Sequence, residues 1–370
     1  MRLNSLLVTG QQGFLTRYHL LFESLARRID QVRYLSYEEV SNTLFDRAVN
    51  KSLRKIAYRI SYRLGDNLFY KSARVFRSRA RKIEARIHRS AEKPDLILHV
   101  FSTSCPQWIR HEVPYAMYLD YTMALAARNW QPWTPFGKRG YQAWMGCETH
   151  AYQKARHLFC MSNLVNTSLI QDYGIGANNI SVVGGSANFD NLFKGEKPFG
   201  SRQILFNGSN FQRKGGDLAV ESFRLARQIL PDAKLIIVGD HFPIREPGVV
   251  CLGHVRSREE MQTLFIGSDV VIAPSYCDPF PTFVLEALHF GVPCIVPDRD
   301  GMPEIITHQV NGLVIPEYSA SAWAKGILDL LQDRSRLEAM SHAGKETIKK
   351  RFNWDRVADQ MLEILLTRRA

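Results

Sequence analysis

The sequence predicts an α/β protein built from two Rossmann-like, doubly wound domains. The chain has 370 residues, which is more than one ordinary hydrophobic core accommodates. Short apolar runs alternate with helical patterns, as parallel strands alternate with the helices that connect them. This alternation is interrupted once, by a polar, glycine-containing stretch at 188–200, and then begins again. The three observations divide the chain into two domains of the same class.

We place the N-terminal domain at 1–190. It begins with an apolar strand at 3–10, a glycine-containing loop at 10–17 and an amphipathic helix at 18–29. A second strand at 31–37 completes a β-α-β unit. Further strands are expected at 95–101, 114–120, 157–162 and 180–185.

The C-terminal domain, at 200–350, repeats this pattern. Its strands are expected at 202–209, 233–240, 248–255, 269–275 and 293–297, with helices between them. The last helical patterns have no strands between them. We expect the final helix, within 351–370, to pack toward the first domain.

Composition excludes several classes of protein. The hydrophobic fraction is 45% and the charged fraction 23%, as in ordinary globular domains. No run of about 18 apolar residues occurs, so no membrane-spanning helix is expected. The six cysteines are scattered and form no CxxC pair, which argues against a disulfide framework or a zinc cluster. The N-terminus reads as a first strand and not as a signal peptide, so we expect a cytoplasmic protein.

Two glycine-containing loops follow predicted strands of the second domain. The loop from Asn207 to Gly216 offers backbone amides, a helix N-terminus, Gly208 and the cations Arg213 and Lys214, which are the parts of a phosphate cradle. Gly239 follows the next strand and permits a ligand to approach the backbone closely. The alternative for each loop is an ordinary surface turn.

Two carboxylates flank a third such loop. Asp278 lies before the helix that starts near Pro281, and Glu286 lies about one turn inside it. Ligands of parallel sheets bind beyond the carboxyl ends of the strands, so the two acids can hold two ends of one ligand over the positive end of the helix. The alternative is a capping aspartate and a solvated glutamate.

The sequence around these acids resembles the family-4 retaining glycosyltransferases, which have the GT-B fold. Asp278 and Glu286, in "CDPFPTFVLEALHFGVPCIVPDRDGMPEII", keep the spacing of the family's E-x7-E motif. "ILFNGSNFQRKGGDLAVESF" resembles the family's donor-phosphate loop, and "AKLIIVGD", "CLGHV" and "HQVNGLVIP" are similar to other parts of it. The resemblance covers 148–354 closely and the N-terminal third in outline. It implies a hexosyltransferase with two domains facing a cleft and a nucleotide-diphosphate sugar as donor.

The resemblance also implies roles for single residues. Lys214 would hold the donor diphosphate, Glu286 would bind the ribose and Asp278 would contact the transferred sugar. Val255 falls where the family contacts the base, and Gly13 would approach the diphosphate from the other domain. Further donor-binding positions would be Gly208, Ser209, Arg213, Gly239 and the backbone at Phe280 and Thr282.

Two positions depart from the family pattern. Ser209 stands where an arginine is common, and Arg213 is its possible replacement. Asp120 stands where the first domain usually has a catalytic-site histidine. We predict that Asp120 joins Asp278 and Lys214 in catalysis by hydrogen-bonding a sugar hydroxyl or the acceptor; the alternative is a strand-end aspartate that caps the next segment.

The predicted chemistry requires no metal and no cofactor. No DxD-like carboxylate pair accompanies the donor loops, and helix N-termini, Lys214 and nearby arginines can neutralise a leaving diphosphate. The resemblance implies retention at the anomeric carbon. A GT-B enzyme of another class, such as a sugar-nucleotide epimerase, is the alternative, and a non-enzymatic binder of anionic polymers is a third hypothesis.

The net charge of +12 is concentrated in an insert at 42–93, which holds 15 Lys or Arg against 4 Asp or Glu. Two apolar stripes at helical spacing predict two basic amphipathic helices: Leu53, Ile56, Ile60 and Leu64, then Phe69, Phe76, Ile83 and Ile87. Either the stripes pack on the first domain, or the basic residues meet an anionic membrane surface. Arg77, Arg79, Arg81 and Lys82 are the predicted contacts of the second interpretation.

A peripheral position on the inner face of the membrane suits an acceptor that is a lipid or a lipid-linked sugar. A soluble anionic acceptor would also use the basic insert. No nucleic-acid-binding module is recognisable in the sequence, so no nucleic-acid partner is expected.

Overall fold

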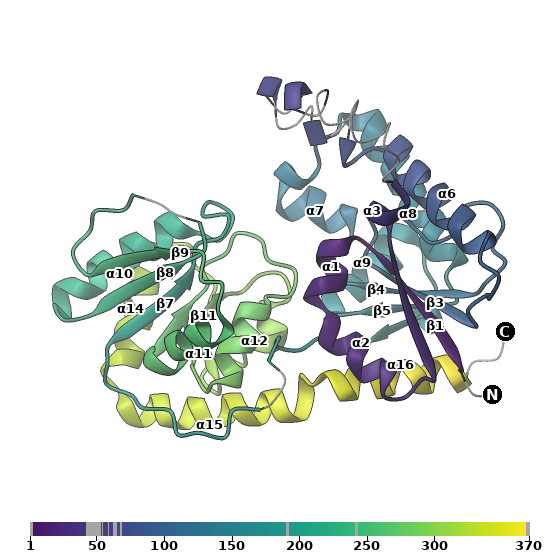
Figure 1. The fold of residues 1–370 in the computed structure, drawn as a ribbon. Coiled ribbons are helices and arrows are strands. Elements are labelled where there is room, and N and C mark those ends of the chain that lie inside the picture. Colours follow the sequence, from purple (N-terminus) through teal and green to yellow (C-terminus); the bar gives the residue numbers. More distant parts are fainter. Residues whose placement is uncertain are drawn as a thin grey trace. The chain divides into compact units, whose positions relative to one another are not determined.

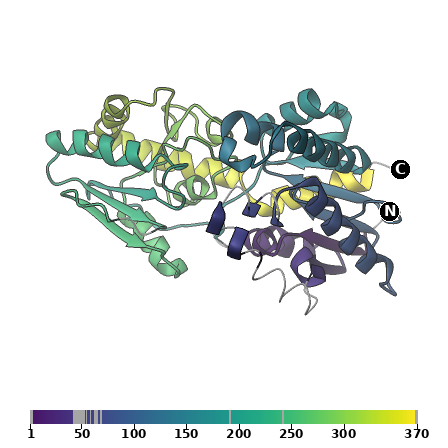
Figure 2. The ribbon, with the colours of Figure 1, turned by 90° about the horizontal axis from the view of Figure 1, so that it is seen from above.

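The structure, a computed structural model, describes residues 3–41, 69–189, 192–240 and 243–367, together with positions 53, 55–57, 59–61 and 65–66. The chain forms two compact units: Met1–Gly184 with Trp354–Ala370, and Gly185–Asn353. Each unit contains a six-stranded sheet (Figure 1). Helices cover both faces of each sheet (Figure 2). The predicted fold class, two doubly wound α/β domains, is confirmed.

The sheet of the first unit is parallel, in the order β2-β1-β3-β4-β5-β6. Every residue of β3, β4 and β5 is buried, which explains why these strands read as continuous apolar runs. The bounds are β1 Ser5–Gly10, β2 Gln31–Ser36, β3 Leu96–Val100, β4 Tyr115–Leu119, β5 His157–Cys160 and β6 Ile180–Val182.

The helices of the first unit are α1 Gln12–Arg17, α2 His19–Ala26, α3 Tyr37–Ser41, α6 Ala73–His88, α7 Met123–Asn129, α8 Lys138–Lys154, α9 Asn163–Tyr173 and α16 Trp354–Thr367, with 3-10 turns η1 Gln131–Trp133 and η2 Ala177–Asn179. The helix predicted at 18–29 is confirmed as α2, although it ends earlier, at Ala26, whereas the loop predicted at 10–17 is wrong, because most of it forms helix α1. Tyr18 separates α1 from α2 with φ −103° and ψ 23°. Its buried ring packs edge-on against Phe101 and Trp354, with centroid distances of 5.4 and 5.9 Å.

Helix α16 packs against α2, so the final helix belongs to the first unit, as predicted. Asp355, in its first turn, accepts hydrogen bonds from Ser24 at 2.5 Å, Arg27 at 2.6 Å and Arg28 at 2.9 Å. The Ser24 hydroxyl and the two guanidinium groups lower the pKa of the Asp355 carboxyl to about 2. These contacts fix α16 beside α2 while the carboxylate is ionised.

Three of the four residues of the second predicted stripe lie on α6 and belong to the core, whereas Phe69 precedes this helix and is partly exposed. Phe76 and Ile83 are fully buried and Ile87 is nearly so, which agrees with the first interpretation. Arg79 was predicted to lie on the basic surface, and this is wrong. Its guanidinium is buried, 4.4 Å from the ring centroid of Tyr37. The first stripe is only partly described: Leu64 lies outside the described residues, as do most positions of 42–68.

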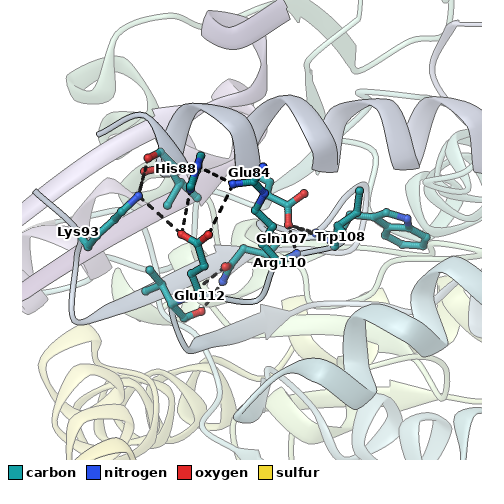
Figure 3. Close-up of polar contacts among 10 residues, drawn as sticks. Glu84, His88, Lys93, Gln107, Trp108, Arg110 and Glu112 are labelled. Atoms are coloured by element: carbon teal, nitrogen blue, oxygen red, sulfur yellow. Dashed lines mark hydrogen bonds and ion pairs between the residues drawn. The ribbon is translucent and has the colours of Figure 1, made fainter. Parts of the chain in front are cut away.

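Glu84 joins α6 to the chain that leads into β4 (Figure 3). One oxygen of its buried carboxylate accepts backbone N–H groups from Trp108 at 3.2 Å, Ile109 at 2.8 Å and Arg110 at 2.6 Å. Three backbone donors are therefore satisfied by one side chain, at the amino-terminal edge of the sheet.

His88 extends this network toward solvent (Figure 3). Arg110 donates to His88 Nε2 at 2.5 Å, so the proton of a neutral ring is on Nδ1, which donates to Glu112 Oε2 at 3.1 Å. This hydrogen bond lowers the pKa of the Glu112 carboxyl. Lys93, which precedes β3, donates to Ile87 O at 2.9 Å and to His88 O at 2.6 Å. The segments that enter β3 and β4 are thus held to the end of α6.

Replacing Glu84 by alanine should destabilise the first unit by about 3 kcal/mol, because three backbone N–H groups lose their acceptor in a buried place. Urea unfolding followed by far-UV circular dichroism measures the shift. Glu112→Ala removes an exposed carboxylate of the same network and should have a much smaller effect. Equal shifts for the two variants would contradict the role given to Glu84.

The sheet of the second unit is also parallel, in the order β12-β11-β10-β7-β8-β9. Its strands are β7 Gln203–Asn207, β8 Lys234–Val238, β9 Val249–Gly253, β10 Val270–Ile272, β11 Cys294–Pro297 and β12 Gly312–Ile315. Its helices are α10 Gly216–Ile229, α11 Arg258–Gly267, α12 Thr282–His289, α13 Met302–Ile305, α14 Ala320–Leu331 and α15 Arg334–Arg351.

The connections of this sheet run in opposite directions from its centre. The chain passes from β7 to β8 on one side and from β10 to β11 on the other. Because parallel crossovers are right-handed, α10 and α12 cover opposite faces. Phe223 of α10 lies in one core cluster with Trp323 of α14, whereas Phe265 of α11 packs against Phe283 of α12 at 5.1 Å. The strand order therefore reverses between β7 and β10.

Candidate functional site

The reversal point between β7 and β10 brings the predicted loops together. The loop after β7 holds Lys214, and the loop after the adjacent β10 holds Asp278. Gly239 follows β8, the other neighbour of β7. Since the carboxyl ends of parallel strands lie at one edge, the three segments predicted from the sequence are neighbours. Such a switch point is where open α/β sheets bind ligands.

Lys214 and Asp278 form an ion pair at the centre of this edge. Their side chains are only 12% and 11% exposed. The backbone N–H of Asp278 donates to Asp300 Oδ2 at 2.8 Å. A buried ion pair stabilises a fold only when its geometry is good. If one partner is removed, the other charge remains buried without a counter-ion, which is strongly destabilising. Because burying two charges costs desolvation free energy, this ion pair is an unfavourable choice for a loop with only a structural role.

Arg213 fastens the two loops to each other. Its Nη1 donates to the carbonyl of Cys277 at 2.5 Å, and its own carbonyl accepts the N–H of Tyr276 at 2.8 Å. The guanidinium thus holds the chain on either side of the ion pair. This position makes Arg213 a part of the scaffold of the site.

Gly215 lets the two loops approach. Its φ is +72°, and a Cβ there would lie 2.0 Å from the carbonyl oxygen of Pro274. Gly239 likewise permits a close contact with the loop that follows β7. Its φ is +109°, and a Cβ there would lie 2.5 Å from the backbone nitrogen of Ser209. Gly208 donates its N–H to Val238 O at 2.7 Å. Three glycines thus maintain close backbone contacts at this edge.

Helix α12 begins at this edge and presents one polar side toward it. Thr282 and Glu286 lie one turn apart and are partly exposed, whereas Phe283, Val284 and Leu285 are buried. The hydroxyl and the carboxylate therefore share one side of the helix. Phe280 is buried, and its ring packs against Phe352 at 5.9 Å, so only its backbone can serve a ligand.

Asp240 and Asp300 are carboxylates of the site that sequence reasoning missed. Asp240 accepts the N–H of Asn210 at 2.8 Å and lies 3.4 Å from His254 Nε2. Val255, predicted to contact the base, is the next residue and is partly exposed. The signal for both acids was available, because Asp240 ends the strand predicted at 233–240 and Asp300 closely follows the one predicted at 293–297.

An aromatic pair beside the ion pair was also missed. The rings of Tyr276 and Tyr318 stack with centroids 5.1 Å apart. The Arg299 guanidinium lies 5.5 Å from the Tyr318 ring and donates to Tyr276 O at 2.9 Å. The Tyr318 hydroxyl donates to Ser275 O at 2.8 Å. The three side chains come from segments far apart in the sequence, so no local pattern predicts them.

The predicted residues of the first unit lie at the carboxyl edge of the other sheet. Gly13 is an exposed residue of α1, just after β1, and no atom lies within 4 Å of a hypothetical Cβ there. Asp120 follows β4 and is partly exposed. One strand, β3, separates β1 from β4. The two predicted residues thus lie at one edge of one sheet.

A buried polar network lies behind Asp120. Glu148 of α8 accepts hydrogen bonds from the Ser102 hydroxyl at 2.8 Å, the Met123 N–H at 3.2 Å and the Tyr173 hydroxyl. Burial raises the pKa of the Glu148 carboxyl. The carboxylate holds the first turn of α7, which begins three residues after Asp120. Sequence reasoning gave no role to Glu148, since a glutamate within a long helix carries no local signal.

This arrangement can stabilise negative charge. In the second unit a lysine ammonium and the amino-terminal end of α12 lie together in a largely buried place, where electrostatic interactions are strong. Among the described residues, no group of three or more His, Cys, Asp or Glu side chains is placed to hold a metal ion. The part of the chain that the structure describes also has no helix of the length and apolarity needed to span a bilayer.

Residues 188–347, which include this site, match the family model of the glycosyl transferases group 1. The matched segment, which makes up most of the second unit, is similar in sequence to the members of this family. An uncharacterized glycosyltransferase of Methanocaldococcus jannaschii is 29% identical over 177 residues, 44% of each protein. A D-inositol 3-phosphate glycosyltransferase of Corynebacterium aurimucosum is 25% identical over 246 residues, 59% of this chain and 58% of that protein. The chain thus spans about half the length of the curated relatives it matches.

The solved structures extend the fold likeness to the whole chain. HepE of Anabaena, crystallised in complex with UDP and glucose, superposes with a TM-score of 0.65 at 16% identity and covers 99% of this chain and 100% of its own. The fold is GT-B, as the resemblance implied. At this identity the likeness is one of fold.

Replacing Gly215 by alanine should separate the loop of Lys214 from that of Asp278, because the new Cβ would overlap the Pro274 carbonyl. A loss of roughly 2 kcal/mol or more in the stability of the second unit is expected from the positive φ and this overlap. Thermal unfolding measures it. Gly267→Ala, at the end of α11 with only a 3.6 Å contact, is the control and should be nearly neutral. A neutral Gly215→Ala would contradict the close approach.

Proposed function

We propose that the protein is a retaining glycosyltransferase, which moves a hexose from a nucleotide-diphosphate donor to an acceptor held by the first unit, without a metal ion. The observation that carries the proposal is the buried ion pair of Lys214 and Asp278 at the switch point of the second sheet. A lysine in that place is suited to a diphosphate, and residues 188–347 match a family of glycosyl transferases.

The donor would lie along the carboxyl edge of the second sheet. We assign the diphosphate to Lys214 and to the backbone N–H groups of Phe280 and Thr282 at the start of α12; Pro281 between them has no N–H to donate. Asp278 would hydrogen-bond the transferred sugar, and Glu286, one turn along α12, would bind the ribose hydroxyls. Gly208, Ser209 and Gly239 would let the diphosphate and nucleoside approach the backbone, with Val255 beside the base.

The ion pair would change partners when the donor binds. A diphosphate carries two or more negative charges and competes for the Lys214 ammonium with Asp278, which then becomes available to sugar hydroxyls. Because Arg213 is engaged by Cys277 O, we propose that it positions the loop and does not replace the arginine absent at Ser209.

The transfer step needs charge neutralisation on the leaving group. The bond between the anomeric carbon and the phosphate oxygen breaks, and its electron pair stays on the nucleotide diphosphate. The acceptor hydroxyl oxygen forms a bond to the anomeric carbon from the same face and gives its proton to the departing phosphate oxygen. Lys214 and the helix end stabilise the charge on that leaving group, and the sugar passes through an oxocarbenium-like state.

The first unit would supply the acceptor side. We propose that Asp120 hydrogen-bonds the acceptor or a sugar hydroxyl, held by the Glu148 network behind it, and that Gly13 lets α1 approach the diphosphate. UDP-hexoses are the donors to test first, since HepE was crystallised with UDP and glucose. The relatives named for D-inositol 3-phosphate make a polyol phosphate the first acceptor to test, before lipids and glycans.

A sugar-nucleotide epimerase of the same fold is the alternative. Such an enzyme would act on the donor without an acceptor, whereas transfer requires one. Nucleotide release from a panel of UDP- and GDP-hexoses, with and without acceptors and in the presence of EDTA, distinguishes the two. Transfer predicts release that depends on an acceptor and survives EDTA. Release of nucleotide with sugar isomerisation alone, or activity that EDTA abolishes and Mg²⁺ or Mn²⁺ restores, would contradict the proposal.

Lys214→Ala should lower kcat/KM by the equivalent of about 2–4 kcal/mol, as when one preorganised donor to a developing anion is lost. The release assay measures this. Lys234→Ala, which removes an exposed lysine at the start of β8, is the matched control and should leave kcat/KM unchanged. Wild-type activity in Lys214→Ala would assign the diphosphate to another cation.

Glu286→Ala should raise the KM for the donor and lower kcat, because the ribose contact also positions the sugar. Stability should change little, since the carboxylate is partly exposed on α12. Glu338→Ala, on the exposed side of α15, is the control. Unchanged donor kinetics in Glu286→Ala would remove this residue from the site.

A further inference from the structure

Helix α6 in the first unit has a cationic side that the transfer reaction does not use. Arg74, Arg77, Ser78, Arg81, Lys82 and Ala85 line a hollow of about 500 Å³. These positions recur every three or four residues and therefore share one side of the helix. The opposite side, with Phe76, Ala80 and Ile83, is fully buried in the core. The core fixes α6, so the arginines are held facing outward.

Among the residues that the structure describes, the arginines of this hollow have no acidic partner. No carboxylate lines the hollow, and within the described ranges Arg74, Arg77 and Arg81 form no ion pair. Exposed cations of the second unit differ: Arg224 lies 2.6 Å from Glu246, Lys325 lies 2.5 Å from Asp329 and Arg334 lies 2.8 Å from Glu338. The like charges of Arg74, Arg77 and Arg81 repel one another unless an anion binds between them.

The same unit exposes large apolar side chains in the preceding part of the insert. Leu53, Ile56 and Ile60 are 52%, 56% and 70% exposed, and their spacing places them on one side of a helix. Lys55 and Arg59 lie among them and are also exposed. Single exposed apolar residues are common, but three on one side of a helix indicate a surface that binds another apolar surface or a lipid bilayer.

We infer that the cationic side of α6 and the apolar side chains at 53, 56 and 60 bind an anionic lipid bilayer. The arginines meet headgroup phosphates, and the apolar side chains enter the boundary between headgroups and acyl chains. A soluble polyanion would satisfy the arginines but would leave Leu53, Ile56 and Ile60 in water. Vesicle binding requires neither donor nor turnover, so it can fail or succeed independently of the proposed transfer.

Co-sedimentation with vesicles tests the cationic part. The vesicles are phosphatidylcholine alone and phosphatidylcholine mixed with phosphatidylglycerol. Wild-type protein should bind the mixed vesicles at low salt and lose binding as salt rises. Arg74→Gln, Arg77→Gln and Arg81→Gln combined should bind on the order of 100-fold more weakly, as expected for three headgroup contacts. The control combines Arg224→Gln, Lys325→Gln and Arg334→Gln, which removes the same charge from the second unit and should bind like wild type.

A second variant tests the apolar part. Leu53→Ser, Ile56→Ser and Ile60→Ser combined should weaken binding to the mixed vesicles at low and high salt alike. Unchanged circular dichroism and thermal midpoints show that the variants fold. Binding of inorganic polyphosphate without vesicle binding would overturn the membrane assignment. So would equal vesicle affinities of the α6 variant and its control.

Discussion

The ion pair of Lys214 and Asp278 is the interaction around which the second unit is arranged. It unites the loops that follow β7 and β10, which are adjacent strands at the reversal of the sheet. Gly215 permits their close approach, Arg213 joins them through Cys277 O, and Asp300 holds the backbone of Asp278. Each of these features costs conformational freedom or burial of charge. Together they place one ammonium beside the positive end of α12, which is where a phosphate chain is best stabilised.

The first unit uses the same sheet architecture with different chemistry at its carboxyl edge. Asp120 and the buried Glu148 network lie there. Its amino-terminal edge is structural, since Glu84 satisfies three backbone N–H groups at that end. The contacts at the amino-terminal edge of the sheet therefore stabilise the fold, and the carboxyl edge is left for ligands. The basic insert adds a third surface, on α6, that serves neither purpose.

The fold was predictable where local pattern and burial coincide. β3 and β4 are buried along their whole length, so they appear in the sequence as apolar runs, and the site loops follow from the rule that parallel strands end at one edge. Arg79 was misplaced although the signal was present: it lies three residues after Phe76 and four before Ile83, on the core side of α6. Its helical spacing from Phe76 and Ile83 predicts a buried position, and this spacing is a stronger signal than the charge, which predicts an exposed one.

Other features could not be read from the sequence. The break at Tyr18 depends on rings of Phe101 and Trp354, which arrive from distant segments. The pairing of Lys214 with Asp278 and the stacking of Tyr276 on Tyr318 depend in the same way on long-range topology. The resemblance supplied the residues of the donor loops but not their mutual contacts, which arise only when β7 and β10 become neighbours.

Calorimetric titration of UDP and GDP into the Asp278→Asn variant tests the central claim most directly. If the ion pair holds Lys214 ready for a diphosphate, removing the competing carboxylate should leave nucleotide affinity equal to or higher than that of the wild type, whereas Lys214→Met should weaken it. If Asp278→Asn loses as much affinity as Lys214→Met, the pair is a structural tie between two loops, and the account of a lysine that exchanges a carboxylate for a diphosphate is contradicted.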